Sequence, residues 1–444
     1  MHLPSADVCS DFLLQCKYVD FKGPTLQVLS LHLHCRRGVL VQLVDGLSTG
    51  CKDITPSDFN VRALVHEYGG GAFTVDGDII IFSNYKDQRL YLQFLTSGDQ
   101  PVPLTPEYGG SQVRYADGVV DRKLNRFITV RDHRIKNREP INEIVAIQFY
   151  GDHTQEPEVL VTGNHFYSFP RLNRDASKIA WIEWSHPNLP WDKTELWIGD
   201  LTKNGKISQK RCLAGSDGSI ESPTEPNGPI KGTSFMFPIR RMAFGISTSG
   251  MEARISKCKS YVGILDLLSC AFNPLQLPFT DIYDLLVKDN ILYVEVASAS
   301  HPLSVAKVNL SSVVSKNLEY SIVWSSNSLN LSEYRPYLTK SEIIEFPTER
   351  PDQTAFTNFY PPYNNDYCSP AGGKPPLIVR CHGRNLAIQF WTSRGWAVAD
   401  ANYGGSTGYG REYRGRLYGA WGIVDVEDCC SCAKFMVRNI LICF

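Results

Sequence analysis

Short apolar strands separated by turn residues recur between about residue 60 and residue 340, and this recurrence limits the fold more than any other feature. Each unit has a turn, an apolar strand, a polar loop and a second strand. Four such units span Phe73–Leu95, Tyr115–Tyr150, Phe169–Leu201 and, with a weaker pattern, Asp284–Leu310. Acidic turn residues recur near the repeat length of about 40–50 residues that is typical of propeller blades, at Asp76, Asp117 and Asp175. The units predict a β-propeller, and a two-sheet β-sandwich is the alternative, since regular short strands suit both.

Two stretches interrupt this pattern. Residues 214–255 begin with a segment rich in Ser, Pro and Gly and continue without clear alternation. The first fifty residues are also irregular. We therefore expect an incomplete β-propeller over residues 1–340, with irregular or missing blade sequence near 1–50 and 214–255.

The character of the chain changes after about residue 340. Segments 343–348 and 356–362 resemble antiparallel strands. Segments 377–383 and 395–405 are nearly continuous apolar runs that end in Gly, which is typical of parallel strands covered by helices. Asp425 and Asp428 form a capping-box pattern that predicts a helix over residues 426–437, and the last five residues look like the start of another buried strand. Residues 341–444 thus predict the N-terminal part of an α/β-hydrolase domain.

The segment Gly404–Gly408 fits the pattern G-x-S-x-G, in which a serine nucleophile stands on a turn between a strand and a helix. Two observations argue against Ser406 as a nucleophile. Gly408 and Gly410 disfavour a following helix by about 1 kcal/mol each. In this fold the His of the triad follows the Ser in the chain, whereas the last His here is His382. We expect Ser406 to lie in a Gly-rich surface loop.

Composition excludes several classes of function. The 444 residues, enough for two domains, carry 45 Lys and Arg against 46 Asp and Glu, so no basic surface predicts a nucleic-acid partner. The sequence has no apolar run of about 18 residues and no signal-like start, so we expect neither membrane association nor secretion. The 13 scattered cysteines indicate free thiols in a reducing, cytoplasmic setting. The spacing of Cys429, Cys430 and Cys432 does not match a zinc site, and no metal or cofactor is expected. The oligomeric state stays open.

Several longer motifs carry a resemblance. They are HEYGGGAFTVDGD (66–78), FSNYKDQRLY (82–91), HPNLPWDKTELW (186–197), PPLIVRCHG (375–383), WTSRGWAVADANYGGSTGYGREY (391–413) and WGIVDVEDC (421–429). Together they resemble the prolyl oligopeptidase family of serine peptidases, above all its acylaminoacyl-peptidase and dipeptidyl-aminopeptidase-like members. The resemblance implies a β-propeller that filters substrates by size, an α/β-hydrolase domain that cleaves peptides, and a peptide substrate.

The resemblance also implies what this chain lacks. His382 and Gly383 correspond to the oxyanion region, but Arg384 replaces a second Gly and the helix-containing stretch that follows in the family looks excised. The family carries its Ser, Asp and His beyond the position of residue 444, so we expect no catalytic residue in this chain and no activity, as in a truncated isoform. A peptide-binding propeller without catalysis and an esterase-type hydrolase are the alternatives.

Three other groups of residues can be interpreted either as functional sites or as structural features. His66, Glu67 and Gly69–Gly71 suggest a metal or phosphate site, but a tight strand bend is favoured. Two larger sets are open to either reading. Four tryptophans, expected in blade cores, could line a channel, and five polar residues, expected in turns, could bind a peptide amino terminus. These sets are Trp181, Trp184, Trp191 and Trp197, and Arg131, Asp132, His133, Asn142 and Glu143.

Overall fold

A computed structural model describes residues 12–439 of the chain, with internal gaps. The residues outside the described part are 1–11, 23–24, 35–36, 45–50, 68, 96–97, 152–155, 174, 216–249, 257–258, 267–270, 289–290, 299, 311–317, 327–330, 369, 371–372, 382–384, 408 and 440–444.

Six antiparallel sheets make up the described part of residues 12–325. Strands that follow one another in the chain are neighbours in each sheet, as in the blade of a propeller. The strands are Phe12–Lys22 (β1), Thr25–His34 (β2), Arg37–Val44 (β3) and Cys51–Asp53 (β4); Phe73–Asp76 (β5), Ile79–Ser83 (β6), Leu90–Phe94 (β7) and Val102–Pro103 (β8); Val113–Asp121 (β9), Arg126–His133 (β10), Ile141–Gln148 (β11) and Glu158–Val161 (β12); Phe166–Leu172 (β13), Lys178–Trp184 (β14), Glu195–Leu201 (β15) and Ile207–Ala214 (β16); Gly250–Ser256 (β17), Lys259–Asp266 (β18) and Ala271–Pro274 (β19); and Asp281–Lys288 (β20), Ile291–Ser298 (β21), His301–Asn309 (β22) and Tyr320–Ser325 (β23).

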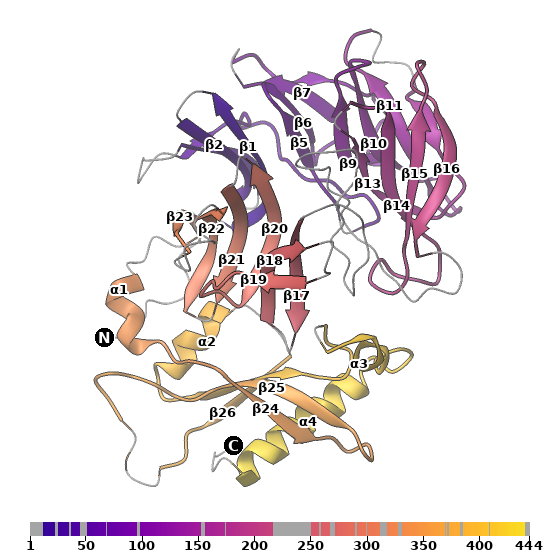
Figure 1. Cartoon of the computed structure of the whole chain (residues 1–444). Coiled ribbons are helices and arrows are strands. Elements are labelled where there is room, and N and C mark those ends of the chain that lie inside the picture. Colours follow the sequence, from indigo (N-terminus) through magenta and orange to yellow (C-terminus); the bar gives the residue numbers. More distant parts are fainter. Residues whose placement is uncertain are drawn as a thin grey trace.

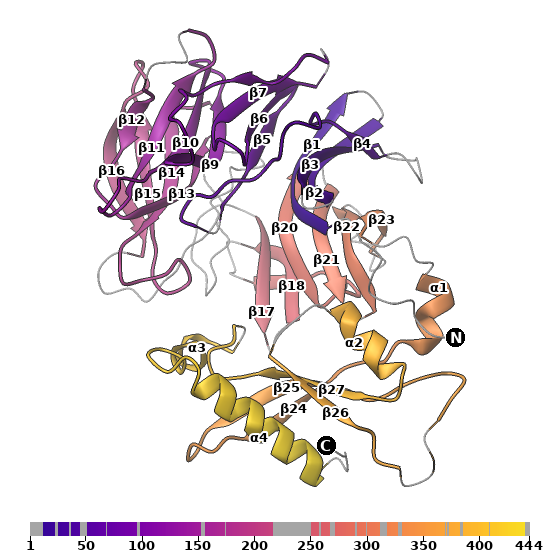
Figure 2. The ribbon, with the colours of Figure 1, turned by 180° about the vertical axis from the view of Figure 1, so that it is seen from behind.

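The sheets are arranged around a ring in chain order (Figure 1, Figure 2). β9 lies against β5 and β13, and β1 lies against both β5 and β20. The first sheet therefore joins the last sheet to the rest of the ring. The expected β-propeller is confirmed, and the sandwich alternative is wrong.

The first sheet corrects one expectation, because residues 12–53 form regular strands where the sequence looks irregular. The apolar residues of β2 alternate, but the alternation changes phase between Val28 and Leu29. The facing strand β1 carries two register shifts, between Leu13 and Gln15 and between Cys16 and Tyr18. Such irregularities hide a two-residue period. The other irregular stretch lies largely outside the described residues, and the domain division at residue 340 stays a prediction.

Asp117 is also corrected, since it lies inside β9 and not in a turn between strands. Its φ is +55°, and the pairing of β9 with β10 shifts register between Ile128 and Val130. The Asp117 carboxylate accepts a hydrogen bond from the backbone N–H of Gly71. The Asp-Gly pair here thus marks a bulge that joins two neighbouring sheets, whereas Asp76 does precede a turn between β5 and β6.

The core of the propeller lies between neighbouring sheets. Phe82, Ile128 and Trp181 come from three successive sheets, are fully buried and belong to one hydrophobic cluster. Each such side chain contributes about 1.5–3 kcal/mol by leaving water. No blade could bury these residues alone, which is why the strands assemble as a ring.

A seventh sheet, of mixed type, forms the C-terminal part, in the order β24-β25-β27-β26 (Figure 1). The strands β24 (Glu342–Pro347), β25 (Thr354–Tyr360) and β27 (Ala397–Asn402) pair antiparallel, and β26 (Leu377–Arg380) pairs parallel to β27. These pairings confirm the predicted antiparallel and parallel strands. The helices are Leu331–Tyr334 (α1), the 3₁₀ helix Arg335–Tyr337 (η2), Asn385–Thr392 (α2), Arg411–Gly415 (α3) and Val424–Asn439 (α4).

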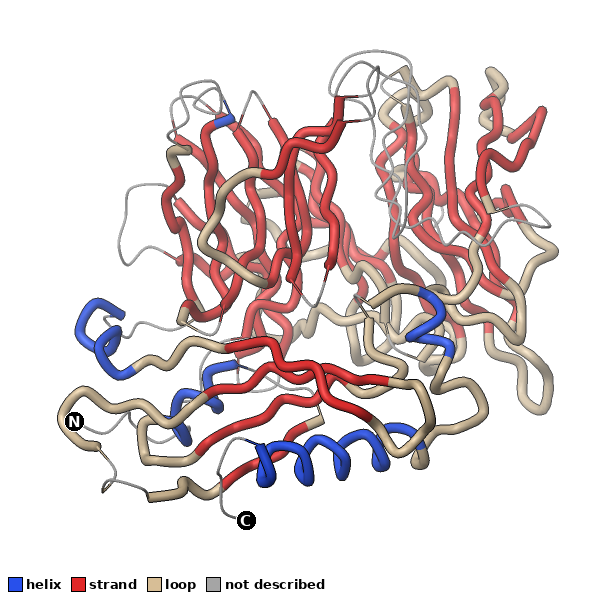
Figure 3. Tube along the Cα trace, turned by 60° about the horizontal axis from the view of Figure 1, so that its bottom comes forward, coloured by secondary structure: helices blue, strands red, loops and turns tan. Residues whose placement is uncertain are grey.

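Helices cover both faces of this sheet. Ala399 of β27 is buried in a cluster with Cys432 and Met436 of α4, and its neighbour Val398 is buried with Ile388 of α2. α2 lies on the face toward the propeller and α4 on the opposite face (Figure 1, Figure 3). The expectation that a helix is missing after Gly383 is wrong, because α2 fills that place with eight residues. None of the described helices is long and apolar enough to cross a membrane.

Candidate functional site

The parallel strands β26 and β27 place their carboxyl ends side by side, with Arg380 in register with Asp400. Ligands of open α/β sheets bind outside the carboxyl ends of the strands, so this edge is the first candidate site. Cys381 follows β26 directly, and the Gly-rich segment 403–410 follows β27. α4 begins next to this segment, since Gly404 lies against Val424.

Three consecutive backbone N–H groups, of residues 404–406, are hydrogen-bonded. Gly404 N–H donates to Oδ2 of Asp428 over 2.7 Å, Gly405 N–H donates to the carbonyl of Tyr413 over 2.9 Å, and Ser406 N–H donates to the carbonyl of Tyr403 over 2.9 Å. Gly405 has a φ of +118°, a value that L side chains rarely adopt. Its backbone also passes so close to Leu417 that a Cβ would lie 2.6 Å from the Leu417 Cβ. Gly405 is therefore required by backbone geometry and close packing.

Ser406 lies in this loop and not at a nucleophile elbow. The next helix, α3, begins only at Arg411 and has five residues. The loop reaches the surface at the exposed Thr407, as expected, but Ser406 itself is only 4% exposed. A nucleophile needs an exposed hydroxyl and a base within hydrogen-bond reach, and no His follows Ser406 in the sequence.

Asp428 has a different role from the predicted capping box. The helix 426–437 is confirmed by α4, but α4 starts at Val424, so Asp425 stands inside the first turn and not at the N-cap. Asp428 faces the loop instead and accepts the Gly404 hydrogen bond. Burial raises the pKa of the Asp428 carboxyl above its ordinary value, against the opposing effect of that hydrogen bond.

The oxyanion remnant His382 and Gly383, together with Arg384, lies outside the described residues. Beside it, the Sγ atoms of Cys381 and Cys429 are 3.3 Å apart. Among the described residues, no three His, Cys, Asp or Glu side chains are grouped so that they could hold a metal ion.

The propeller residues considered for an amino-terminal subsite form internal pairs. Arg131 and Asp132 of β10 stand opposite Glu143 and Asn142 of β11, and all four are buried. The Arg131 guanidinium donates to Glu143 over 2.5 and 3.1 Å. Their position inside strands corrects the expectation of polar turns, and only His133, half-buried, stands at a strand end. The carboxylate of Glu143 is therefore already paired with Arg131, which also donates to Glu156 over 2.6 Å.

The bend at His66 is confirmed as a feature of the backbone, with φ of +116° at Gly69 and +90° at Gly70. Two hydrogen bonds of His66 hold the bend in place. Its backbone N–H donates to Asp132 over 3.0 Å, and its ring Nε2 donates to Oδ1 of Asn142 over 3.1 Å. Burial lowers the pKa of the His66 imidazole, so the neutral ring is favoured.

An aromatic cluster that the sequence did not predict surrounds this bend. The ring of Phe166 stacks on Trp184 at 5.2 Å between centroids and meets His66 at 5.1 Å and His186 at 4.8 Å. His66 and His186 come from two of the motifs that carry the family resemblance. Their presence in these motifs was the only sequence signal we find for this cluster. The blade-core prediction is confirmed for Trp181, Trp184 and Trp197 but is wrong for Trp191, which is 42% exposed in a loop.

This end of the propeller lies toward the C-terminal part. The loop after Trp184 carries Asp192, and the hydroxyl of Tyr418 donates to Asp192 Oδ2 over 3.2 Å. The backbone N–H of Leu189 donates to the same oxygen over 3.0 Å. Asp192 belongs to the Pro-Trp-Asp motif of the sequence, so one motif residue helps to join the two parts.

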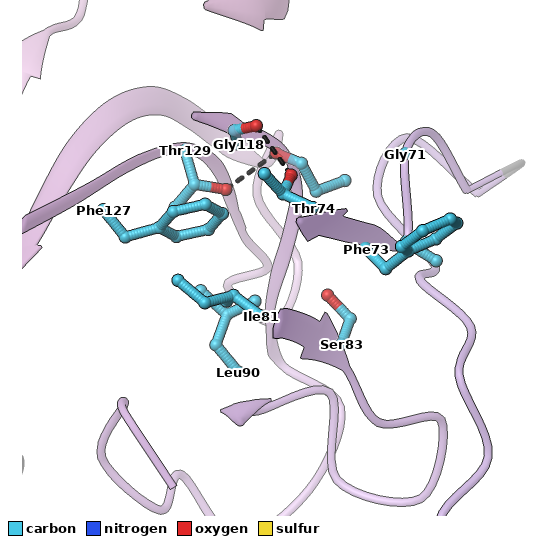
Figure 4. Close-up of a pocket in the computed structure, with 11 residues that line it drawn as sticks. Gly71, Phe73, Thr74, Ile81, Ser83, Leu90, Gly118, Phe127 and Thr129 are labelled. Atoms are coloured by element: carbon cyan, nitrogen blue, oxygen red, sulfur yellow. Dashed lines mark hydrogen bonds between the residues drawn. The ribbon is translucent and has the colours of Figure 1, made fainter. Parts of the chain in front are cut away.

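A void between the second and third sheets is a packing gap and not a ligand site (Figure 4). Its three hydroxyls belong to Thr74, Ser83 and Thr129. They donate to the carbonyls of Gly118, Tyr115 and Ala116 over 2.7, 2.6 and 2.8 Å, respectively. The first two bonds tie β5 and β6 to β9, and the third joins β10 to β9 within one sheet. The rest of the lining is mostly apolar: Gly71, Ala72, Phe73, Ile81, Leu90, Ala116, Gly118 and Phe127.

Comparison with known proteins agrees with this geometry. Residues 383–442, which span α2, β27, the loop and α4, match the model of the prolyl oligopeptidase family. The resemblance to the prolyl oligopeptidase family is confirmed. No curated protein matches the chain.

Solved structures share the fold over nearly the whole chain. A puromycin-hydrolyzing peptidase of Mycobacterium tuberculosis has a TM-score of 0.79 at 24% identity, over 97% of this chain and 72% of its own. A puromycin hydrolase has the same TM-score at 25% identity, over 96% of this chain and 72% of its own. A prolyl endopeptidase has a TM-score of 0.67 at 14% identity, over 98% of this chain and 67% of its own. The order of a propeller followed by a hydrolase-type sheet is thus shared with these enzymes.

Proposed function

We propose that this chain carries the scaffold of a serine-type peptidase that acts on short peptides, and that residues 1–444 do not hydrolyse peptide bonds by themselves. The match of residues 383–442 to the family carries the first half of the proposal. The buried position of Ser406, in a loop fixed by Asp428, carries the second.

The chemistry of the family needs a Ser nucleophile, a His base and an Asp that orients it. Within residues 1–444 the chain order does not supply such a set after Ser406, because the last His there is His382. The proposed setting is the cytoplasm, which the scattered thiols favour. A propeller in front of the hydrolase sheet favours peptides over lipids as substrates, as in the peptidases of similar fold.

Turnover assays test the proposal. The 444-residue chain is incubated with fluorogenic aminoacyl and short peptidyl substrates and with aryl esters, and Ser406→Ala serves as the matched control. We expect no turnover above the Ser406→Ala variant, because loss of a triad member costs about 10⁶ in kcat in a well-studied serine protease. Peptide turnover that Ser406→Ala abolishes would overturn the proposal. Turnover of esters alone would favour the esterase alternative.

A further inference from the structure

Two cysteines meet at the edge of the C-terminal sheet. Cys381 is the residue after β26 and is exposed, and Cys429 is partly buried in the second turn of α4. Their Sγ atoms lie 3.3 Å apart although 48 residues separate them in the chain. β26 is the last strand of the described sheet and pairs there with β27.

We propose that Cys381 and Cys429 form a modification site, at which a low-molecular-weight disulfide oxidises the pair to a reversible intramolecular disulfide. A disulfide requires the sulfur atoms about 2.05 Å apart, so the gap must close by little more than about 1 Å. Rotation of the exposed Cys381 side chain can supply this movement. α4 packs directly on β26, so the two backbones are already neighbours in the native fold.

The order of the two steps follows from exposure. The Cys381 thiolate attacks one sulfur of oxidised glutathione, and a glutathione thiolate leaves. Cys429 then loses its proton and attacks Sγ of Cys381 in the mixed disulfide, which releases the second glutathione. Two protein thiols are thereby oxidised to one disulfide and one glutathione disulfide is reduced to two thiols. Burial raises the pKa of the Cys429 thiol, so Cys429 is less often a thiolate and reacts only in the second step, where the neighbouring mixed disulfide makes the attack intramolecular.

Neighbouring cysteines supply the controls. Cys430 is the next residue of α4 and is exposed, but it stands about 100° further around the helix. Cys432 is buried against β27 in the apolar cluster with Met436, and burial raises its pKa to about 11. Cys430→Ser therefore removes a thiol from the same helix without touching the proposed pair.

The disulfide would join the carboxyl end of β26 to α4 one residue away from Asp428. It would thus fix the edge strand to the helix that holds the loop 403–410. Because the proposal depends only on the Cys381–Cys429 geometry, it stands or fails independently of peptidase function.

The experiment uses the full 444-residue chain, folded and treated with oxidised glutathione, followed by alkylation and peptide mapping. We expect one dominant linked peptide pair, Cys381 with Cys429, a loss of two of the 13 thiols, and full reversal by dithiothreitol. Cys430→Ser should keep the link, whereas Cys381→Ser, at an exposed position, should fold normally and lose it. The unfolding midpoint of the C-terminal part should rise on oxidation in the wild type and in Cys430→Ser but not in Cys381→Ser.

Two results would overturn the proposal. In one, Cys381 accumulates as a mixed disulfide with glutathione and Cys429 stays reduced. In the other, links spread over several cysteine pairs with similar yields, or persist in Cys381→Ser.

Discussion

The hydrogen bond from Gly404 N–H to Asp428 is the contact on which our view of the Ser406 loop depends most. Replacement of Asp428 by Ala removes the acceptor and leaves a buried donor, which costs about 1–3 kcal/mol. Since about 1.4 kcal/mol is a factor of ten in an equilibrium, the Gly404 amide should exchange with solvent about 5- to 150-fold faster. Asp428→Asn keeps an oxygen acceptor at the same place and should preserve most of the protection.

Hydrogen exchange of the loop measures this change locally. The amides of Gly405 and Ser406 donate to Tyr413 and Tyr403, so they should keep their protection in both variants and serve as internal references. Equal exchange at Gly404 in the wild type and in Asp428→Ala would refute the reasoning. So would Asp428→Asn behaving like Asp428→Ala.

The same residue gives a prediction on pH. Because burial raises the pKa of Asp428 above the ordinary 3.8, the folded state binds its proton more tightly than the unfolded state does. Its contribution to stability is therefore fully present below pH 3.8 and is lost as the pH rises through the folded pKa. Asp428→Asn should accordingly stabilise the C-terminal part more at neutral pH than near pH 3.8, as measured by urea unfolding at both pH values. A stabilisation that is larger at the acidic pH would contradict the assigned sign.

Three further substitutions test the packing. Gly118→Ala would place a Cβ 1.9 Å from Cζ of the buried Phe127. We therefore expect the free energy of unfolding of the propeller, measured by chemical denaturation, to fall by about 1–3 kcal/mol. Arg126→Met would remove the cationic partner of Asp121, where both side chains are 1% exposed, and should cost about 3–5 kcal/mol in the same assay. Tyr418→Phe removes the hydroxyl that donates to Asp192 and should change the overall unfolding energy by less than about 1.5 kcal/mol while increasing protease cleavage near residue 418.

The sequence predicted those strands and helices whose pattern of apolar and turn residues matches the local structure. The apolar run at β27 is buried between helices on both faces and the run at β26 is half-buried, and such strands show no alternation to misread. The repeated units of β5–β15 predicted blades because turn residues separate their apolar strands at regular intervals, although β9 carries a bulge at Asp117. β1 and β2 were missed because register shifts break the alternation that identifies strands. Asp117 was misplaced because an Asp-Gly pair suits a bulge as well as a turn.

The candidate site was harder to predict, because its contacts join residues that are distant in the sequence. The rejection of Ser406 as a nucleophile needed only chain order and glycine positions. The bond from Gly404 to Asp428, the contact between Tyr418 and Asp192 and the approach of Cys381 to Cys429 arise only when the sheet brings α4 and the loops together. The pairing of Arg131 with Glu143 likewise depends on the register of two strands, which no local pattern reveals.

Labelling with an active-site-directed fluorophosphonate tests the central claim most directly. The folded 444-residue chain is incubated with the probe and its intact mass is measured, with Ser406→Ala and denatured protein as controls. We predict no stoichiometric adduct, because Ser406 is buried in a fixed loop and no His follows it in the chain. A one-to-one adduct that maps to Ser406 and disappears in Ser406→Ala would contradict the account.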